Sequence, residues 1–289
     1  MSDMIKTYAN TARTFIPRRI RVSPWHLLSY AILLALAVAY LGPLLMMVNT
    51  SLMTNREFMR NATAKPKTLQ FENFSEAWEK ANFSQYLKNS FIYAASATTI
   101  YVITAVFVAF PIARRYIRGW NTLFTLFVIA LFLPPALIPQ FQLILNLGLY
   151  NTRIGYILLL ITNPIGIIIL VNSMKAIPRE LDEAAAIDGC GYFRFVLTVV
   201  FPLARPAIAT VVVLHAIGIW NELILATIYL TRQDYYPITR GMIVFQGVYG
   251  FNWPVLAAAI MIMALPMVVL FLFLQRYIIS GLTQGSLTG

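Results

Sequence analysis

The sequence predicts an all-α integral membrane protein with six transmembrane helices. Of its 289 residues, 59% are hydrophobic and only 11% are charged, whereas soluble domains carry about 25% charged residues. The mean hydropathy is +0.71. A helix needs about 20 apolar residues to cross the hydrocarbon core. The stretches that reach this length are Trp25–Leu52, Ser90–Ala113, Trp120–Leu145, Gly155–Met174, Ala207–Leu230 and Val255–Leu274.

Lysine and arginine residues beside these stretches predict how the chain threads the membrane. Cytoplasmic loops of membrane proteins carry an excess of both. Among the short loops, those after the second and fourth stretches are the more basic. The basic residues of the N-terminal tail and of these two loops are Lys6, Arg13, Arg18, Arg19, Arg21, Arg114, Arg115, Arg118, Lys175, Arg179, Arg194 and Arg205. We therefore expect both termini in the cytoplasm. We interpret the net charge of +11 as a topology signal and expect no nucleic-acid partner.

The composition excludes several kinds of site. A single cysteine, Cys190, allows no disulfide within the chain. The two histidines, His26 and His215, are far apart and no Cys/His cluster is present, so we expect no metal site. The motif GxxxxGK followed by Ser or Thr is absent, so the chain has no P-loop for the phosphates of ATP. We accordingly predict no catalytic residues.

Three neighbouring stretches are interrupted by residues that break or kink helices. The third holds Pro134, Pro135 and Pro139, the fourth holds Asn163-Pro164, and the fifth holds glycine and polar residues. Lipid tolerates broken helices only where protein or a water-filled cavity covers the freed backbone groups, and such breaks mark substrate routes in transporters. Kinking for packing alone is the alternative. For a substrate pathway we consider Gln140, Asn163, His215, Trp220, Asn221 and Glu222.

Glu222 is the acidic residue that falls inside a predicted span. A charge at the bilayer centre costs about 2.5–3.5 kcal/mol even on the mildest scale, so its side chain should face the interior of the bundle. His215 and Glu222 are two helical turns apart and share one face, with Gly218 between them. That face either lines a cavity or locks helices together through hydrogen bonds.

The loop after the fourth stretch is acidic and tightly punctuated. Pro178 suits the first position of a helix, and acidic residues follow where the helix dipole favours negative charge. Gly189 should end this helix with a positive φ. The residues expected on one narrow face of it are Leu181, Ala184, Ala185 and Asp188. A second short apolar segment, Tyr192–Val200, follows, and Pro202 and Pro206 turn the chain back into the fifth stretch. This helix-turn-helix is either a docking element for another protein or a solvated connector.

The same loop resembles that of permease subunits in binding-protein-dependent ABC importers. The similarity rests on Glu183-Ala184-Ala185, on Gly189 and on Pro202. More narrowly, the run IPRELDEAAAIDG, the WNE of 220–222 and the C-terminal GLTQGSLTG resemble the carbohydrate-uptake branch, in particular its maltose-type second permease subunit. The resemblance covers nearly the whole chain. Cys190 departs from the alanine that the family more often has.

The resemblance implies a type I ABC importer permease bundle in a bacterial-type cytoplasmic (inner) membrane, with a loop that docks into a partner ATPase. It assigns ATPase coupling to Glu183, Ala184, Ala185, Asp188, Gly189 and Pro202. The implied partners are a related permease subunit in a heterodimer, two ATPase subunits, an extracytoplasmic sugar-binding protein and membrane lipid. ATP and Mg would bind the ATPase subunits, and this chain would bind no cofactor.

We expect one membrane domain in four parts. Residues 1–24 form a cytoplasmic tail, and 25–84 form the first transmembrane helix and a long extracytoplasmic loop. Residues 85–279 form the permease core with its coupling loop 177–206, and 280–289 form a second cytoplasmic tail. The apolar run that starts at Trp25 is too long for a cleaved signal peptide, so we interpret it as a retained span.

Several functions stay open beside import of an oligosaccharide. A polyol, glycerol phosphate or an acidic sugar is an alternative substrate. An ion-coupled secondary transporter would need more intramembrane ionisable residues and paired repeats. An intramembrane enzyme would need at least two placed acid and base groups. A single acidic residue, Glu222, favours neither of these two.

The loop Thr231–Trp253 is rich in aromatic residues. So many rings are unfavourable in water unless something covers them. We expect the tip of this loop to contact the sugar-binding protein, and packing against the chain's own surface or the sister permease is the rival explanation. The rings are those of Tyr235, Tyr236, Phe245, Tyr249, Phe251 and Trp253.

Overall fold

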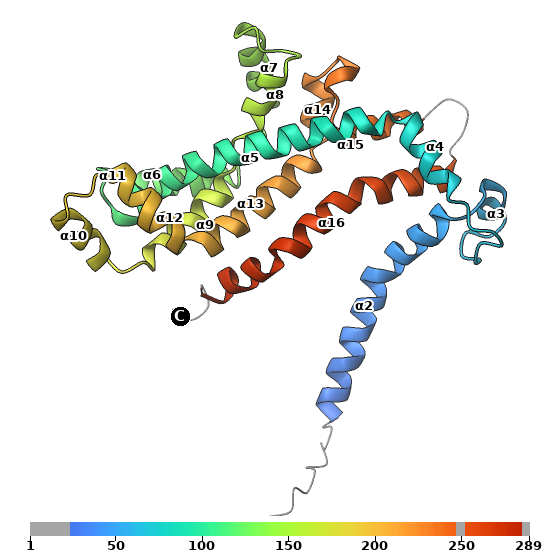
Figure 1. Ribbon diagram of the computed structural model, residues 1–289, viewed down its shortest axis with the longest axis horizontal. Helices are drawn as coiled ribbons and strands as arrows, with labels where there is room; N and C mark the ends of the chain where they lie inside the picture. Colours follow the sequence, from blue (N-terminus) through green and yellow to red (C-terminus); the bar gives the residue numbers. More distant parts are fainter. Residues whose placement is uncertain (1–23, 247–251, 285–289) are drawn as a thin grey trace, which may run out of the picture. The chain divides into compact units, whose positions relative to one another are not determined.

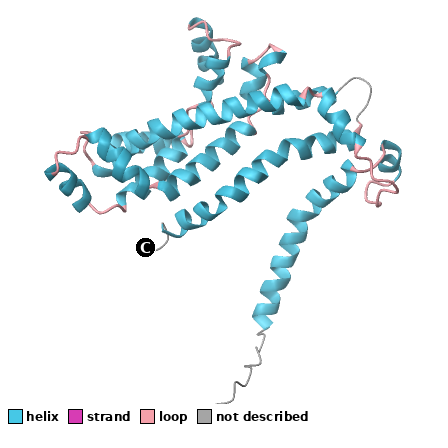
Figure 2. Ribbon diagram, in the orientation of Figure 1, coloured by secondary structure: helices cyan, strands magenta, loops and turns pink. Residues whose placement is uncertain are grey.

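The structure is a computed structural model that describes residues 24–246 and 252–284. All regular elements within these residues are helical and none is a strand (Figure 2), which confirms the predicted all-α fold. The chain divides into two units, Met1–Met46 and Met47–Gly289.

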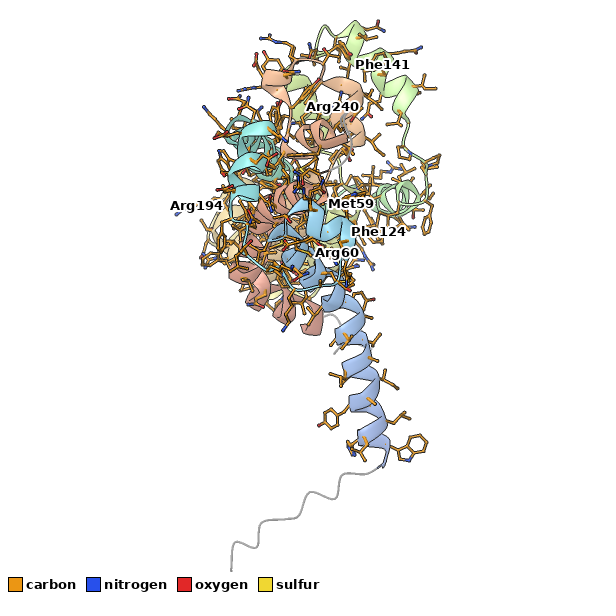
Figure 3. All side chains as sticks on the ribbon, turned by 90° about the vertical axis from the view of Figure 1, so that its right-hand side faces the viewer. Met59, Arg60, Phe124, Phe141, Arg194 and Arg240 are labelled. Atoms are coloured by element: carbon orange, nitrogen blue, oxygen red, sulfur yellow. The ribbon has the colours of Figure 1, made fainter. Side chains whose placement is uncertain are left out.

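Helix α2 (Pro24–Ser51) supplies nearly all of the described part of the first unit. From Trp25 to Met46 every residue except Gly42 is exposed, and Figure 3 shows side chains on all sides of this helix. Its mean hydropathy reaches 2.4. A helix that is apolar all round and this long is typical of a membrane span, as the sequence predicts.

The loop between α2 and the next long helix carries two short helices, α3 (Asn55–Arg60) and α4 (Glu72–Lys80). A capping box starts α3, because the Thr54 hydroxyl accepts the N–H of Glu57 at 3.2 Å while the Glu57 carboxylate accepts the N–H of Thr54 at 3.0 Å. The long loop predicted here is therefore partly helical.

Helix α5 (Phe83–Arg114) is 32 residues long and has its inner face buried in the second unit. It begins well before the predicted Ser90, because a hydropathy window overlooks polar helical turns, and its first turns hold Gln85, Lys88 and Asn89. Buried residues recur along it every three or four positions, and small ones among them let neighbouring helices approach closely. The small ones are Ala94, Ala97, Ala105, Ala109 and Ala113.

Helices α9 (Pro164–Lys175) and α13 (Arg205–Trp220) pack along α5, and α16 (Trp253–Gln284) packs on α13 and on α4 (Figure 1). Two buried apolar clusters fill this bundle. The first contains Tyr93 and Tyr156, whose rings meet edge to face at 4.8 Å. The second extends along the C-terminal half of α5.

The third, fourth and fifth predicted spans are each divided in two. The proline pair separates α6 (Trp120–Ala130) from α7 (Leu137–Asn146). Helix α8 (Arg153–Leu160) meets α9 at a bend of 48°. Helix α13 is followed by α14 (Ile224–Tyr229) after a break at 221–223. Proline lacks an N–H to continue a helix, and Asn163 caps α9 by accepting the N–H of Ile165 at 3.1 Å.

Three helices of the described chain are long and apolar enough to cross a membrane: Trp25–Ser51, Phe83–Arg114 and Trp253–Phe273. The count rises to five if each of two bent pairs is one span. Helix α6 is apolar but shorter. The number of six spans and the cytoplasmic placement of the termini stay predictions. The bent pairs are Arg153–Leu160 with Pro164–Lys175 and Tyr192–Leu203 with Arg205–Trp220.

Short helical elements complete the second unit. They are α10 (Glu180–Ile187), α11 (Tyr192–Phe195), a π-helical turn (Val196–Val200), α12 (Phe201–Leu203), a 3-10 turn (Gln233–Tyr235), α15 (Ile238–Gly241) and a second 3-10 turn (Met242–Gln246).

Candidate functional site

The acidic loop forms the predicted helix-turn-helix, and its first helix is α10. Glu180, Asp182 and Glu183 occupy the first turn, where the helix dipole favours negative charge. Pro178 lies just before the helix rather than in its first turn, and Arg179 is the N-cap residue. The acidic residues therefore begin the helix.

Gly189 ends α10 in the predicted way. Its φ is +67°, its N–H donates to the carbonyl of Ala186 at 3.1 Å, and the N–H of Cys190 donates to that of Ala185 at 2.8 Å. These two bonds form a Schellman motif, which satisfies carbonyls at a helix end and favours glycine at the left-handed position. A Cβ at Gly189 would meet no atom within 4 Å, so the backbone conformation alone requires glycine.

Most residues of α10 are exposed. None of its residues is buried. Of the four residues expected on one face, Leu181, Ala184 and Asp188 are exposed, while Ala185 is half-buried against the second apolar cluster. The side chain of Ile187 is 87% exposed. An exposed, small-residue surface ending in an aliphatic side chain is available to a partner protein.

The return segment bends sharply into α13. Helical residues Tyr192–Leu203 and Arg205–Trp220 meet at 83°. Pro202 lies in the first turn of α12 and is half-buried, and Pro206 lies in the first turn of α13. Both prolines occupy positions where a helix needs no N–H, so they are compatible with the helix starts on either side of the bend.

A buried arginine that the sequence analysis treated only as a topology signal holds the base of this loop. Arg114, the last residue of α5, pairs with Asp182 at 2.7 Å. Its guanidinium also donates to the carbonyls of Ile177 at 2.8 Å and Pro178 at 3.3 Å. The Tyr116 hydroxyl donates to the same carboxylate at 2.9 Å. Burial and the Asp182 charge raise the pKa of Tyr116.

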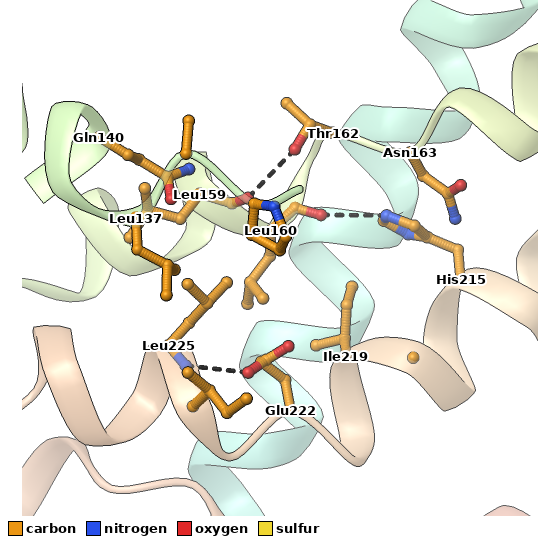
Figure 4. Close-up of a pocket in the computed structure, with 14 residues that line it drawn as sticks. Leu137, Gln140, Leu159, Leu160, Thr162, Asn163, His215, Ile219, Glu222 and Leu225 are labelled. Carbon is orange, nitrogen blue, oxygen red and sulfur yellow. Dashed lines mark hydrogen bonds between the residues drawn. The ribbon is translucent and has the colours of Figure 1, made fainter. Parts of the chain in front are cut away.

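The three helix breaks surround one cavity of about 510 Å³ (Figure 4). Backbone groups freed by broken helices are tolerated in lipid where they line such a cavity. Its polar side chains come from all three breaks, and the rest of its wall is apolar. The lining residues are Pro135, Ala136, Leu137, Gln140, Leu159, Leu160, Thr162, Asn163, His215, Gly218, Ile219, Glu222, Ile224 and Leu225.

His215 both lines the cavity and joins three helices. Its Nδ1 lies 3.2 Å from the hydroxyl of Thr98 on α5, and its Nε2 lies 3.0 Å from the carbonyl of Leu160 at the end of α8. The ring stacks on Tyr101 at 4.3 Å between centroids. The two interpretations of the His215 face, a cavity wall and a hydrogen-bond lock, therefore describe the same side chain.

Glu222 lies at the break between α13 and α14. Its carboxylate accepts the N–H of Leu225 at 2.9 Å, and its carbonyl accepts the hydroxyl of Thr239 at 2.9 Å. The described residues give it no ion-pair partner, and no lysine or arginine lines the cavity. The cavity therefore carries one carboxylate among neutral polar groups.

Trp220 and Asn221 do not line the cavity. Trp220 is buried, donates its Nε1–H to the carbonyl of Met263 at 3.0 Å and meets Phe91 edge to face. Asn221 is exposed and donates to the carbonyl of Ile217 at 3.0 Å. The structure thus brings Gln140, Asn163, His215 and Glu222 together and places these two beside the break.

At the opposite end of α5, hydrogen bonds from side chains hold the backbone of the 231–246 segment. The fully buried Asn89 donates to the carbonyls of Asp234 at 2.8 Å and Tyr236 at 3.0 Å, and it accepts from Arg153 at 3.0 Å. The Tyr93 hydroxyl donates to the carbonyl of Tyr235 at 2.8 Å. Sequence analysis missed this network because its members are far apart along the chain.

The aromatic rings of this segment that the structure describes pack on the chain itself. Tyr235, Tyr236 and Phe245 are half-buried against the first apolar cluster, which favours the rival explanation for them. Tyr249 and Phe251 lie outside the described residues. Within the described residues, no group of three or more His, Cys, Asp or Glu residues could hold a metal ion.

Residues 81–284 match the protein family described as "Binding-protein-dependent transport system inner membrane component". The melibiose/raffinose/stachyose import permease protein MelC of Bacillus subtilis is 32% identical over 258 residues, which are 88% of this chain and 93% of MelC. The diacetylchitobiose uptake system permease protein NgcG of Streptomyces coelicolor is 30% identical over 265 residues, 90% of this chain and 88% of NgcG.

Two further comparisons extend this similarity. The arabinooligosaccharides transport system permease protein AraQ of Halalkalibacterium halodurans is 30% identical over 253 residues, 86% of this chain and 91% of AraQ. A chain in the crystal structure of a bacterial ABC transporter involved in the import of the acidic polysaccharide alginate superposes with a TM-score of 0.80. That superposition covers 92% of this chain and 99% of the other at 22% identity, so it shows a shared fold.

Proposed function

Because this chain belongs to the family of inner membrane components of binding-protein-dependent transport systems, we propose that it moves an oligosaccharide through the membrane as one half of the pathway of an ABC importer. The chain is the permease and not the enzyme of that importer. One observation carries the substrate class. Three relatives at least 30% identical along 86% or more of the chain are named for import of oligosaccharides such as raffinose, diacetylchitobiose and arabinooligosaccharides.

The working assembly contains a related permease subunit, two ATPase subunits that bind ATP and Mg, and an extracytoplasmic sugar-binding protein. The chain resides in the cytoplasmic membrane of a bacterium, with six spans and both termini inside. The basic loops next to the exposed α10 support this orientation, because they place α10 where cytoplasmic ATP is available to its partner.

Helix α10 is the contact for the ATPase. Its exposed small residues allow a partner surface to approach closely, the carboxylates of Glu183 and Asp188 complement basic side chains, and its Schellman motif holds its C-terminal end in one conformation. We assign docking to Glu183, Ala184, Ala185 and Asp188, and maintenance of the loop shape to Gly189 and Pro202.

The cavity is this chain's contribution to the sugar pathway. Sugar hydroxyls need donors and acceptors, and Gln140, Thr162, Asn163 and Glu222 supply both in one cavity. The amide of Gln140 makes no side-chain hydrogen bond with other described residues and is available to a substrate. We assign Trp220 and Asn221 to the support of the helix break.

A neutral sugar suits the cavity better than an acidic one. Glu222 places a carboxylate in the wall with no cation beside it, and like charges repel strongly where water is scarce. The alginate importer shares only the fold with this chain. Glycerol phosphate and acidic sugars are disfavoured on the same ground, and a neutral polyol is the remaining alternative.

Transport by the purified assembly tests this function. The chain should be co-expressed with its permease and ATPase partners, placed in liposomes, and supplied with the binding protein after a thermal-shift screen against neutral oligosaccharides. We expect ATP-dependent uptake by the assembly and none by the chain alone. Robust energised uptake by the lone chain, or a binding protein stabilised by no sugar, would overturn the proposal.

A charge reversal tests the docking role. Glu183→Lys should abolish uptake and the stimulation of ATP hydrolysis by the binding protein, while the chain still inserts into the membrane. Glu180→Lys reverses a neighbouring exposed charge outside the assigned docking residues and should retain more activity. Normal uptake by Glu183→Lys, equal to that of Glu180→Lys, would show that the loop is a connector.

A further inference from the structure

The first turn of α10 and the residues just before it are attached to the C-terminal end of α5. Arg114 is only 4% exposed, and its guanidinium joins the C-terminal end of α5 to Asp182 and to the carbonyls that precede α10. A buried arginine with several fixed acceptors holds one geometry, because its planar group of donors must match those acceptors. The front of the loop helix therefore follows α5.

A second attachment lies behind α10. Pro111 sits inside the last turns of α5, and it lacks the N–H that would bond the carbonyl of Phe107. The hydroxyl of Tyr192, at the start of α11, donates to that carbonyl at 3.1 Å. The ring of Tyr192 also packs near Phe110 and Phe107, with centroids 6.0 and 6.2 Å apart. Pro111 thus leaves the carbonyl of Phe107 without its helical donor, and the Tyr192 hydroxyl of the loop donates to it instead.

Little else ties α10 to the bundle. None of its residues is buried, and its side chains make no other charged contact among the described residues than the one to Arg114. Force applied to α10 reaches α5 at two polar points on its last two turns, and the Tyr116 hydroxyl just beyond α5 supports the first of them through Asp182. The front point is the Arg114–Asp182 pair and the rear point is the Tyr192–Phe107 bond.

Helix α5 connects these points to the cavity and to the 231–246 segment. It is one continuous helix of 32 residues. Halfway along it, Thr98 contacts His215 and the Tyr101 hydroxyl donates to the carbonyl of Asn163 at the break of the fourth span. Near its start, Asn89 and Tyr93 hold the 231–246 segment. Movement of α5 would act on the cavity wall through His215 and Asn163, which line it.

We propose that Arg114 and Tyr192 are positioning residues that clamp α10 to α5 at two points, so that displacement of α10 by the ATPase becomes displacement of α5 at the cavity. The proposal rests on the proposed role of α10 as the ATPase contact. Neither residue touches ATP or sugar. Their role is to make the loop and the helix move as one body.

Two isosteric variants loosen the clamp while leaving most contacts. Asp182→Asn removes the charge but keeps an oxygen for Arg114, which also keeps its two carbonyl acceptors. Tyr192→Phe removes one hydroxyl. The matched control is Glu180→Gln, which removes an acidic charge from the same turn where no contact is made. All three are studied in the complete assembly with both ATPase subunits.

The main readout is sugar taken up per ATP hydrolysed. Each clamp variant should lower this ratio about fivefold, the low end of typical coupling between sites, while assembly and ATP hydrolysis persist. The control should match the wild type. A merely structural role would instead reduce assembly, uptake and hydrolysis in parallel, and that result or an unchanged ratio would overturn the clamp.

Amide hydrogen exchange gives a readout that needs no sugar. In the wild type, a non-hydrolysable ATP analogue should change exchange in both 180–187 and 107–116. In the clamp variants the change should be confined to 180–187, and its undiminished spread to 107–116 would refute the clamp. Failure of the wild-type assembly to import any oligosaccharide would refute the proposed substrate, and the exchange result would still decide the clamp.

Discussion

Helix α10 and the 231–246 segment are both attached to α5, near its opposite ends, by different chemistry. Helix α10 has no buried residue, and the Arg114–Asp182 pair and the hydroxyls of Tyr116 and Tyr192 hold it in place. In the 231–246 segment Ile238, Thr239 and Gly241 are buried, and neutral hydrogen bonds to Asn89 and Tyr93 hold its backbone. A buried hydrogen-bond network makes the arrangement that it holds more rigid. An exposed helix held at two points can be displaced as a unit. The 231–246 segment is therefore suited to stay in place, and α10 is suited to move.

The largest effect is expected at Gly189, because the end of α10 depends on the backbone conformation of this residue. Gly189→Val should abolish uptake while insertion stays normal. The left-handed conformation costs a non-glycine residue about 1–2 kcal/mol, and a β-branched side chain is especially disfavoured there. Uptake and membrane content of the assembly measure the result.

Gly148→Val is a matched control for this substitution. Gly148 has the same φ of +67° and no atom within 4 Å of an added Cβ, but it lies after α7 and outside the coupling loop. It should carry similar strain and retain uptake per ATP. Equal loss of uptake per ATP in both variants would show that the effect does not depend on the place of Gly189 in the coupling loop.

At the 231–246 segment, loss of the buried Asn89 amide should lower the stability of the assembly rather than the ratio of uptake to ATP hydrolysis. Asn89→Ala removes one donor from the carbonyl of Asp234, the amide donor of the Tyr236 carbonyl and the amide acceptor of Arg153, and a buried group left unsatisfied costs about 1–3 kcal/mol. The melting temperature of the detergent-solubilised assembly should fall. Gln85→Ala, which removes one bond of 3.1 Å to the Asp234 carbonyl from a less buried residue, should lower it less. A lower ratio of uptake to ATP hydrolysis with unchanged melting would contradict the assignment.

A smaller effect is expected from the hydroxyl beside the charged pair. Tyr116→Phe removes one hydrogen bond to Asp182, about 0.5–1.5 kcal/mol, and leaves Arg114 in place. Because burial raises the pKa of Tyr116, the neutral phenol stabilises the fold below its ordinary pKa of 10.0, and this contribution is lost as the pH rises through the folded value. Unfolding measured from pH 8 upward should show a steeper alkaline loss in the wild type than in Tyr116→Phe.

The smallest effect concerns the capping box of α3. Hydrogen bonds from the backbone and hydroxyl of Thr54 lower the pKa of Glu57. Because the folded state favours the ionised carboxylate of Glu57, its contribution to stability is present above the ordinary pKa of 4.5. That contribution is lost as the pH falls through the lower pKa of the folded state. The protection factors of the amides of 55–60, which take the intrinsic slowing of exchange toward acid pH into account, should fall between pH 6 and 3 in the wild type. Glu57→Gln should show no such step, and a step that persists would assign it to another group.

Local patterns were sufficient for the elements whose physics is local. Hydropathy identifies α2 and α16 because membrane spans must satisfy their own backbone groups. Acidic residues and Gly189 bracket α10 because the helix dipole and the left-handed C-terminal position act within a few residues. Breaks in the third and fourth spans could be anticipated from Pro134, Pro135 and Asn163, and the structure divides each of these predicted ranges into two helices.

The sequence by itself determined the helical class, the apolar spans and the punctuation of the loop, because these depend on composition and on neighbours along the chain. Tertiary structure alone decided what α5 connects. Asp182 meets Arg114, Asn89 meets the carbonyl of Asp234, and His215 meets Thr98 across more than sixty positions in each case. A hydrogen bond requires its two groups to lie within about 3.2 Å. No local periodicity encodes that distance, and only the packing of α5 against its neighbours sets it.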